Sequence, residues 1–244
     1  MDTLSSSFKS KETFPAKTSS KFKSEISTLL EIYLFTCMLE VKAFAVRPPA
    51  KRIKSSISSP RINPVLAEDR TAEQIRMLEP VFGDSPVPNL FATVLANEPL
   101  FETWLPFCLK LLVRSAFDRR ERELVILRVA HTCSADYEWH HHVPIGRRAG
   151  LTDAEIERVT DPTIAEWETR DRALLAATDE LLDRRTLDDN TWDALVAVGL
   201  SQEQLIELPM LVGHYALLAG TLNALGIRIE EPTDDDRPIS AGAH

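Results

Sequence analysis

The sequence contains little cysteine, and its cysteines lie far apart. Only Cys37, Cys108 and Cys133 occur among 244 residues, and no two of them form a CxxC pair. This spacing provides no disulfide framework, and isolated free thiols are typical of proteins in a reducing compartment. We therefore expect a cytoplasmic protein without structural disulfides.

Long apolar runs are also scarce. The best candidate for a membrane-spanning segment, residues 26–46, is interrupted by Glu31, Glu40 and Lys42. Its uninterrupted part is far shorter than the ~20 apolar residues that a transmembrane helix needs. We therefore expect no membrane partner, although a basic start before a short apolar run loosely resembles a targeting segment.

Lysine almost disappears after residue 60, and this change indicates a domain boundary. Residues 1–60 hold 10 basic and 5 acidic residues, whereas residues 61–244 hold 18 basic and 32 acidic ones. We predict a disordered or non-native extension over 1–60, with a targeting segment or a folded element as alternatives. We predict a globular domain over 61–230 and an acidic flexible tail over 231–244. The acidic body argues against a nucleic-acid partner.

The body has the apolar spacing of helices, and no segment shows the sustained period-2 alternation of a strand. Several segments begin with capping residues, such as Thr71 and Thr152, and Gly150 can end another. The sequence therefore predicts an all-α fold. Its expected helical segments cover 72–82, 89–98, 99–117, 119–133, 137–150, 151–159, 164–184, 187–200 and 201–227.

Two stretches of the body look alike. Residues 139–159 and 192–211 both run from a tryptophan through small residues to Gly-Leu-Thr or Gly-Leu-Ser and an acidic, apolar segment. The glycines of the two joins, Gly150 and Gly199, are 49 residues apart. Either a duplicated helical hairpin unit or a chance similarity between two helix–glycine–helix joins can explain the pattern.

The stretch CSADYEWHHHVPIG, residues 133–146, concentrates groups that can do chemistry. Glu138 and His142 are four residues apart, so on a helix they share one face. The positive N-terminal end of that helix favours an ionised Glu138, which could orient His142 as a general acid or base. Glu123 lies one helix earlier, and a hairpin of the two helices could bring it beside His142. The alternative is that Glu123 only forms the exposed start of its helix.

The run RERELVILRVAHTCSADYEWHHHVPIGRRAGLTDAEI, residues 120–156, resembles the core motif of the carboxymuconolactone decarboxylase and alkyl hydroperoxidase D (AhpD-like) superfamily. A weaker similarity extends over about residues 60–228. The resemblance implies an AhpD-like helical bundle and a homo-oligomer, a trimer or a hexamer. We interpret the internal similarity within this bundle as a duplicated helical hairpin.

The peroxidase branch of the superfamily carries a glutamate, a CxxC pair and a histidine at fixed spacing. Anchored on His142, the glutamate falls on Glu123, and the two cysteines fall on Ala135 and Glu138. The resemblance thus implies that the proton-relay residues are kept and both redox cysteines are missing. In the decarboxylase branch the second cysteine position tends to be a glutamate, which Glu138 matches.

Further residues near the motif are candidates for substrate binding, each with a plain structural alternative. Arg128 could clamp a substrate carboxylate or pair with an acid. Tyr137 and Trp139 could stack on a substrate or pack in the core. His214 could line the pocket, or form a core pair with Tyr215. We expect no metal, because HExxH is absent, although Glu123, Glu138, His142 and a distant His214 could supply the roughly three convergent ligands that a metal needs.

We therefore expect a cofactor-free enzyme with a small-molecule substrate. His142, Glu138 and Glu123 would transfer protons on a carbonyl-activated organic acid or lactone, by decarboxylation, isomerisation or dehydration. One alternative is an alkyl hydroperoxidase-type peroxidase that uses Cys133 with an outside thiol, although Cys133 also reads as a buried structural thiol. The other is a non-catalytic oligomeric module, because a fold does not fix a function.

Overall fold

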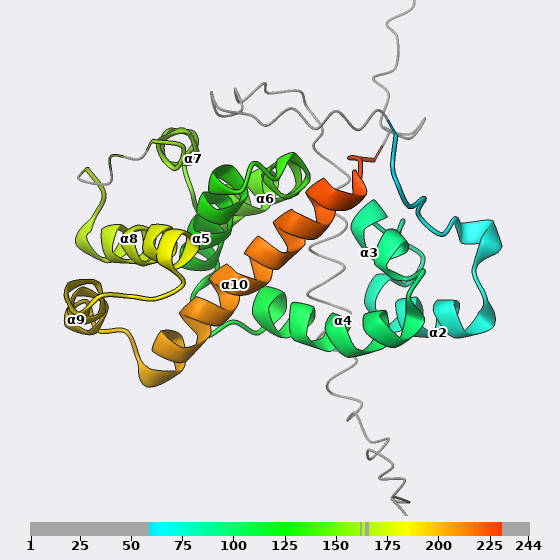
Figure 1. Cartoon of the computed structure of the whole chain (residues 1–244), viewed down its shortest axis with the longest axis horizontal. Helices are drawn as coiled ribbons and strands as arrows, with labels where there is room; N and C mark the ends of the chain where they lie inside the picture. The colour runs from blue at the N-terminus through cyan, green and yellow to red at the C-terminus, as the bar shows by residue number, and fades with distance from the viewer. Residues whose placement is uncertain (1–58, 162, 164–165, 231–244) are drawn as a thin grey trace, which may run out of the picture.

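The computed structural model describes residues 59–161, 163 and 166–230, which are coloured in Figure 1. The predicted extension over 1–60 lies outside the described residues except for its last two positions, and the predicted tail over 231–244 lies wholly outside them.

Throughout this part, the regular secondary structure consists of helices alone, which confirms the all-α prediction. The order along the chain is a short 3-10 helix, η1 (Ala67–Asp69), and then α2 (Ala72–Phe82), α3 (Asn89–Val94), α4 (Glu98–Val113), α5 (Arg119–Thr132), α6 (Asp136–Ala149), α7 (Asp153–Arg158), α8 (Thr169–Arg184), α9 (Asp189–Ala197) and α10 (Gln202–Leu225).

Side-chain caps fix the starts of several helices. Thr71, Thr152 and Ser201 each accept a hydrogen bond from the backbone N–H three residues later, and the side chain of that later residue bonds back. Such capping boxes satisfy two donors that the first turn of a helix would otherwise leave without a partner. The sequence signals at Thr71 and Thr152 are therefore confirmed as helix starts.

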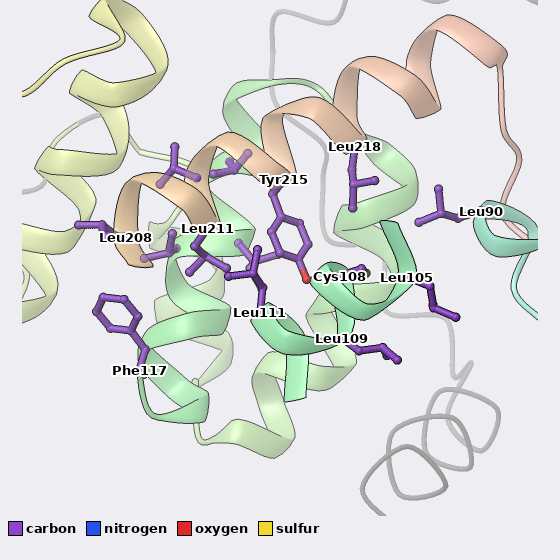
Figure 2. Packing of buried hydrophobic residues seen from close by; sticks show 14 of the residues in the cluster. Leu90, Leu105, Cys108, Leu109, Leu111, Phe117, Leu208, Leu211, Tyr215 and Leu218 are labelled. Carbon is purple, nitrogen blue, oxygen red and sulfur yellow. The ribbon is translucent and has the colours of Figure 1, made fainter. Parts of the chain in front are cut away.

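Helix α5 is the central element of the bundle. It packs against α6, α8 and α10, and its residues 121–130 are all buried. The larger apolar cluster joins α4, α5, α8 and α10, and Figure 2 shows part of it between α4 and α10. A smaller cluster lies between α5, α6, α7 and α8. A polar side chain on α5 or α6 that points into this packing is therefore removed from water.

The two similar stretches fold into the same kind of join. Gly150 has a φ of 107° and Gly199 a φ of 79°, values that favour glycine. In both joins the next residue, Leu151 or Leu200, is buried and bonds to the carbonyl five residues before it. Beyond the joins the helices differ, because α7 has 6 residues and α10 has 24. The internal similarity therefore reaches the joins but not the length of the helices that follow.

Candidate active site

Glu123 and His142 meet in the interior of the α5–α6 hairpin. His142 Nδ1 lies 2.7 Å from Glu123 Oε2, and the two residues are 5% and 0% exposed. Gly146, one turn after His142, makes this close approach of the helices possible. A Cβ atom at Gly146 would lie 3.1 Å and 3.2 Å from leucine Cδ1 atoms and 3.7 Å from Glu123 Cβ. The pairing expected from the hairpin is therefore present.

A cation neighbours this pair. Arg122 donates from Nη2 at 2.8 Å and from Nε at 3.0 Å to Glu123 Oε1. Burial raises the pKa of Glu123, but His142 and Arg122 lower it more, so that it lies below its usual value. Glu123 is therefore a buried carboxylate, held as an anion by partners on both of its oxygens. Sequence reasoning missed Arg122, since nothing in a charged helix start shows which arginine turns inward.

Glu138 does not orient His142, which corrects the sequence-based expectation. Glu138 is 3% exposed, and neither of its carboxyl oxygens has a hydrogen-bond partner among the described residues. Burial raises its pKa well above the usual value. The positive end of α6 is too weak to offset this desolvation. Burial thus favours the neutral form of Glu138, and Glu123 is the carboxylate that holds His142.

The two described cysteines have the properties of packed thiols. Cys108 on α4 is 4% exposed, and burial raises its pKa to about 12. Cys133, the residue that ends α5, packs partly buried against the larger cluster. Its pKa is raised above the usual value, by burial first and then by Glu138. The structural reading of Cys133 therefore has direct support, and neither cysteine has the lowered pKa of a reactive thiol.

Tyr215 borders the pair from α10, although sequence reasoning treated it only as a companion of His214. Its ring meets the His142 ring edge-on, with 5.2 Å between their centroids. Figure 2 shows it pointing from α10 toward α4, the helix that carries Cys108. His214 lies one ring further away, buried beside Trp104 and Phe107, and burial lowers its pKa to about 4. His214 is thus a core residue, separated from His142 by Tyr215.

Arg128 is not available to clamp a substrate, which corrects that expectation. Its guanidinium forms a two-pronged ion pair with Asp179 on α8, with distances of 2.7 Å and 2.6 Å. It also donates to the backbone carbonyls of Val159 and Asp161, at 2.5 Å and 2.7 Å. The arginine is 4% exposed. It therefore ties α5 to α8 and to the end of α7, as the alternative reading had it.

Tyr137 also has a structural role rather than a substrate-stacking one. Its hydroxyl donates to Glu230 Oε1 at 2.6 Å and accepts from the Leu90 N–H at 3.2 Å. His141 Nε2 lies 2.8 Å from the other oxygen of Glu230. These contacts join the start of α6 to α3 and to the chain that follows α10. Of the three consecutive histidines, His142 is the one that pairs with the buried Glu123.

Trp139 packs in the core as well. It lies against the smaller apolar cluster, and its ring centroid is 6.3 Å from that of His131. Neither aromatic neighbour of the motif is therefore placed as a substrate platform. Among the described residues, no group of three His, Cys, Asp or Glu side chains is arranged to hold a metal ion.

Comparisons with known proteins agree with this architecture. Residues 98–180 match the model of the Carboxymuconolactone decarboxylase family. An uncharacterised peroxidase-related protein from Ralstonia eutropha JMP134 with an alkylhydroperoxidase AhpD core superposes with a TM-score of 0.61 and 20% identity, over 73% of this chain and 95% of that one. An uncharacterised peroxidase-related protein from Silicibacter sp. TM1040 gives 0.57 and 15%, over 79% and 97%.

A third solved structure is a cysteine-to-alanine variant of the debrominase Bmp8 in complex with 2,3,4-tribromopyrrole. It superposes with a TM-score of 0.55 and 19% identity, over 71% of this chain and 93% of that one. Identities this low show that the fold is shared. They carry no information about whether an activity is shared. No curated protein sequence matches the chain significantly. The predicted AhpD-like helical bundle is therefore confirmed.

Proposed function

Because this chain belongs to the carboxymuconolactone decarboxylase/AhpD-like superfamily, we propose that it is a cofactor-free enzyme that transfers protons on a small, carbonyl-activated organic acid or lactone. The reaction would be a decarboxylation, an isomerisation or a dehydration, because all three use the same acid–base groups. This proposal rests on one observation: of two buried carboxyl groups, Glu123 is paired on both oxygens with Arg122 and His142, whereas Glu138 has no hydrogen-bond partner among the described residues. These surroundings shift the two pKa values in opposite directions.

Opposite shifts of neighbouring carboxyl groups are typical of acid–base sites. His142 and Arg122 favour the ionised form of Glu123, whereas burial without partners favours the neutral form of Glu138. Glu138 and His142 are four residues apart on α6, which places their Cβ atoms ~5–6 Å apart. A base and an acid within one helical turn can serve two atoms of one small substrate.

His142 would act as the base. Its Nδ1 faces the Glu123 carboxylate, so the proton of the neutral ring is on Nδ1 and the Nε2 lone pair lies on the other edge of the ring. Nε2 would accept a proton from a carbon next to the substrate carbonyl. The resulting imidazolium would be stabilised by Glu123, as a carboxylate stabilises the histidine of a catalytic triad.

Glu138 would act as the acid. Its O–H would donate a hydrogen bond to the substrate carbonyl oxygen, on which negative charge develops when the carbon loses its proton. In an isomerisation, His142 would return the proton to another carbon. In a dehydration, the hydroxyl group on the adjacent carbon would take the proton from His142 and leave as water. In a decarboxylation, Nε2 of His142 would first take the proton of the substrate carboxylic acid. The bond to the carboxylate carbon would then break with release of CO₂, and the new carbanion would take that proton back from His142.

The thiol chemistry of the described residues supports acid–base over redox work. A thiol peroxidase of this type needs an attacking thiolate and a resolving thiol within disulfide reach. Ala135 and Glu138 occupy the two cysteine positions of the family motif, and the pKa values of Cys108 and Cys133 are raised.

The proposal is tested by assaying a panel of unsaturated lactones and β-keto acids with the purified protein, in the absence of thiols and peroxides. We expect turnover of at least one compound, loss of most of it in Glu138→Gln, and no effect of Cys133→Ser. The control separates the two chemistries. Peroxide turnover with a dithiol that disappears in Cys133→Ser would overturn the proposal in favour of the peroxidase alternative.

A further inference from the structure

The candidate active site lies inside the protein. His142, Glu138 and Tyr215 are 5%, 3% and 3% exposed, and neither carboxyl oxygen of Glu138 has a hydrogen-bond partner among the described residues. Figure 2 shows Tyr215 and Cys108 among buried leucine side chains between α4 and α10. A small substrate that reaches His142 and Glu138 is therefore removed from water, and the surrounding groups determine whether it can carry a charge there.

Negative charge is destabilised in this region. Burial raises the pKa of Glu138 well above its usual value, that of Cys108 to about 12, and that of Cys133 above its usual value. An ionised Glu138 would raise the pKa values of both thiols further, so the three groups lie within electrostatic reach of one another. Removal from water disfavours the charged form of any acid. The carboxylate of a substrate would meet the same penalty as that of Glu138.

Positive charge is destabilised one ring further away. The His214 ring meets the Tyr215 ring edge-on, with 5.5 Å between their centroids. Burial lowers the pKa of His214 to about 4, and its Nε2 atom has no hydrogen-bond partner among the described residues. Surroundings that disfavour both a carboxylate and an imidazolium are of low polarity, and do not simply repel one sign of charge.

The buried arginines already have carboxylate partners. Within the described part of the chain, Arg122 and Arg128 are the buried basic side chains besides histidine. Arg122 donates from two nitrogens to Glu123 Oε1. Arg128 forms its two-pronged pair with Asp179 and donates to two backbone carbonyls. A carboxylate ligand would have to break one of these pairs, and breaking a buried pair is strongly unfavourable.

The charges of the site are balanced without a substrate. The cation of Arg122 compensates the anion of Glu123, and the neutral forms of His142 and Glu138 add nothing. An uncharged substrate preserves this balance during proton transfer, because the imidazolium and the enolate form together. A carboxylate substrate would add an uncompensated negative charge before any proton moves.

We propose that the site selects a small uncharged carbonyl compound, such as a lactone, ketone or ester, over a carboxylate. This inference rests on the proposed function and narrows it to isomerisation or dehydration of such a compound. Decarboxylation would require the acid to enter in its neutral form. A carboxyl group with an ordinary pKa of ~4.3 is neutral in only about one molecule in 500 at pH 7.

The test compares 3-oxocyclopentanecarboxylic acid with its methyl ester. Both contain the same ketone, and the small ring keeps the carboxyl group close to it. Dissociation constants for the full chain are measured by NMR titration at pH values from 5 to 8. We expect the ester to bind at least about a hundredfold more tightly than the acid at pH 7. This ratio should fall about tenfold for each unit by which the pH is lowered, because only the neutral acid enters.

Glu138→Gln is the matched control for this binding measurement. It should keep the ratio of the two affinities within about threefold of the wild type, because the preference comes from low polarity and not from a charge on Glu138. A ratio that falls to one in Glu138→Gln would show that an ionised Glu138 repels the acid, and would overturn the inference. An acid that binds the wild type as tightly as the ester, or an ester that does not bind, would overturn it as well.

Deuterium exchange next to the ketone of the same two compounds separates this inference from the proposed function. Exchange that is lost in His142→Ala supports proton transfer, whichever compound reacts. Tighter binding of the ester without exchange in either compound would contradict the proposed function and uphold the selectivity of the site. Exchange in both compounds with equal affinities would uphold the proposed function and overturn the selectivity.

Discussion

Replacing Glu138 by leucine should make the protein more stable and remove its activity. The carboxyl group is buried, and neither oxygen has a partner among the described residues. A buried polar group without a hydrogen bond costs about 1–3 kcal/mol, and leucine has a similar size without that cost. The free energy of unfolding should therefore rise by roughly 1–3 kcal/mol, which corresponds to an increase in Tm of roughly 2–12 °C for a domain of this size.

The pH dependence of the free energy of unfolding provides a second, independent test of this prediction. The pKa of Glu138 is raised in the folded protein from its ordinary value of 4.5. Below that value both the folded and the unfolded chain hold the proton, and ionisation adds nothing. As the pH rises above it, the unfolded chain ionises while the folded one does not, and the wild type loses stability. The advantage of Glu138→Leu should thus grow with pH, by up to about 1.4 kcal/mol per pH unit, until the pH passes the raised pKa.

Urea unfolding at pH values from 4 to 8, at one fixed protein concentration, measures both effects. Glu138→Gln is the matched control, because it removes the titrating group but keeps an unpaired polar group. Its free energy of unfolding should therefore lack the dependence on pH that Glu138 causes, and should rise by less than that of Glu138→Leu. A less stable Glu138→Leu at every pH would refute the reasoning, since it would mean that Glu138 makes a favourable contact in the folded state. A difference that does not change with pH would show that the carboxyl is not desolvated.

Three further predictions concern the residues around the site. Arg128→Ala should lower the free energy of unfolding by roughly 1.5–3 kcal/mol, because it leaves Asp179 and two backbone carbonyls without their donor; an unchanged thermal transition would show that Arg128 is free for a ligand after all. The pKa of Glu230 is about 2, because contacts with His141, Tyr137 and the Asn89 N–H outweigh the effect of burial. The contribution of Glu230 to stability should be present above pH 4.5 and be lost as the pH falls towards 2. Glu230→Gln should abolish that part of the acid denaturation profile. An unaltered profile would count against the contact. In a Cys37→Ser background, Cys108 should react with a maleimide at pH 7 only on unfolding and Cys133 more slowly than free cysteine; rapid labelling of Cys133 would favour the peroxidase alternative.

Sequence reasoning recovered the elements that depend on local signals. Examples are the caps at Thr71 and Thr152 and the glycine at Gly150. At these positions the backbone hydrogen bonds are made with residues a few positions away in the sequence. The juxtaposition of Glu123 and His142 could also be anticipated, because two consecutive helices with a short connection must fold back on each other. Both predictions need only neighbours in the sequence.

The errors concern residues whose partners lie far away in the sequence. The role of Arg128 is set by Asp179, 51 residues later, and that of Tyr137 by Glu230, 93 residues later. Glu138 was expected to be ionised from its place in the first turn of α6, but its burial in the folded chain raises its pKa well above the usual value. Spacing along one helix shows which face a side chain is on, and not what packs against that face.

The most direct test of the proposed chemistry is hydrogen–deuterium exchange at carbon. The wild-type chain in D₂O is incubated with the panel of β-keto acids and unsaturated lactones, and deuterium entering next to the carbonyl is followed by NMR. Exchange reports proton transfer whichever net reaction follows. We predict enzyme-dependent exchange that His142→Ala slows by ~10²–10⁴-fold, the usual cost of losing a positioned acid–base group, while His140→Ala exchanges at nearly the wild-type rate. Equal exchange in His142→Ala and wild type, or an equally large loss in His140→Ala, would contradict the assignment of His142 as the proton carrier.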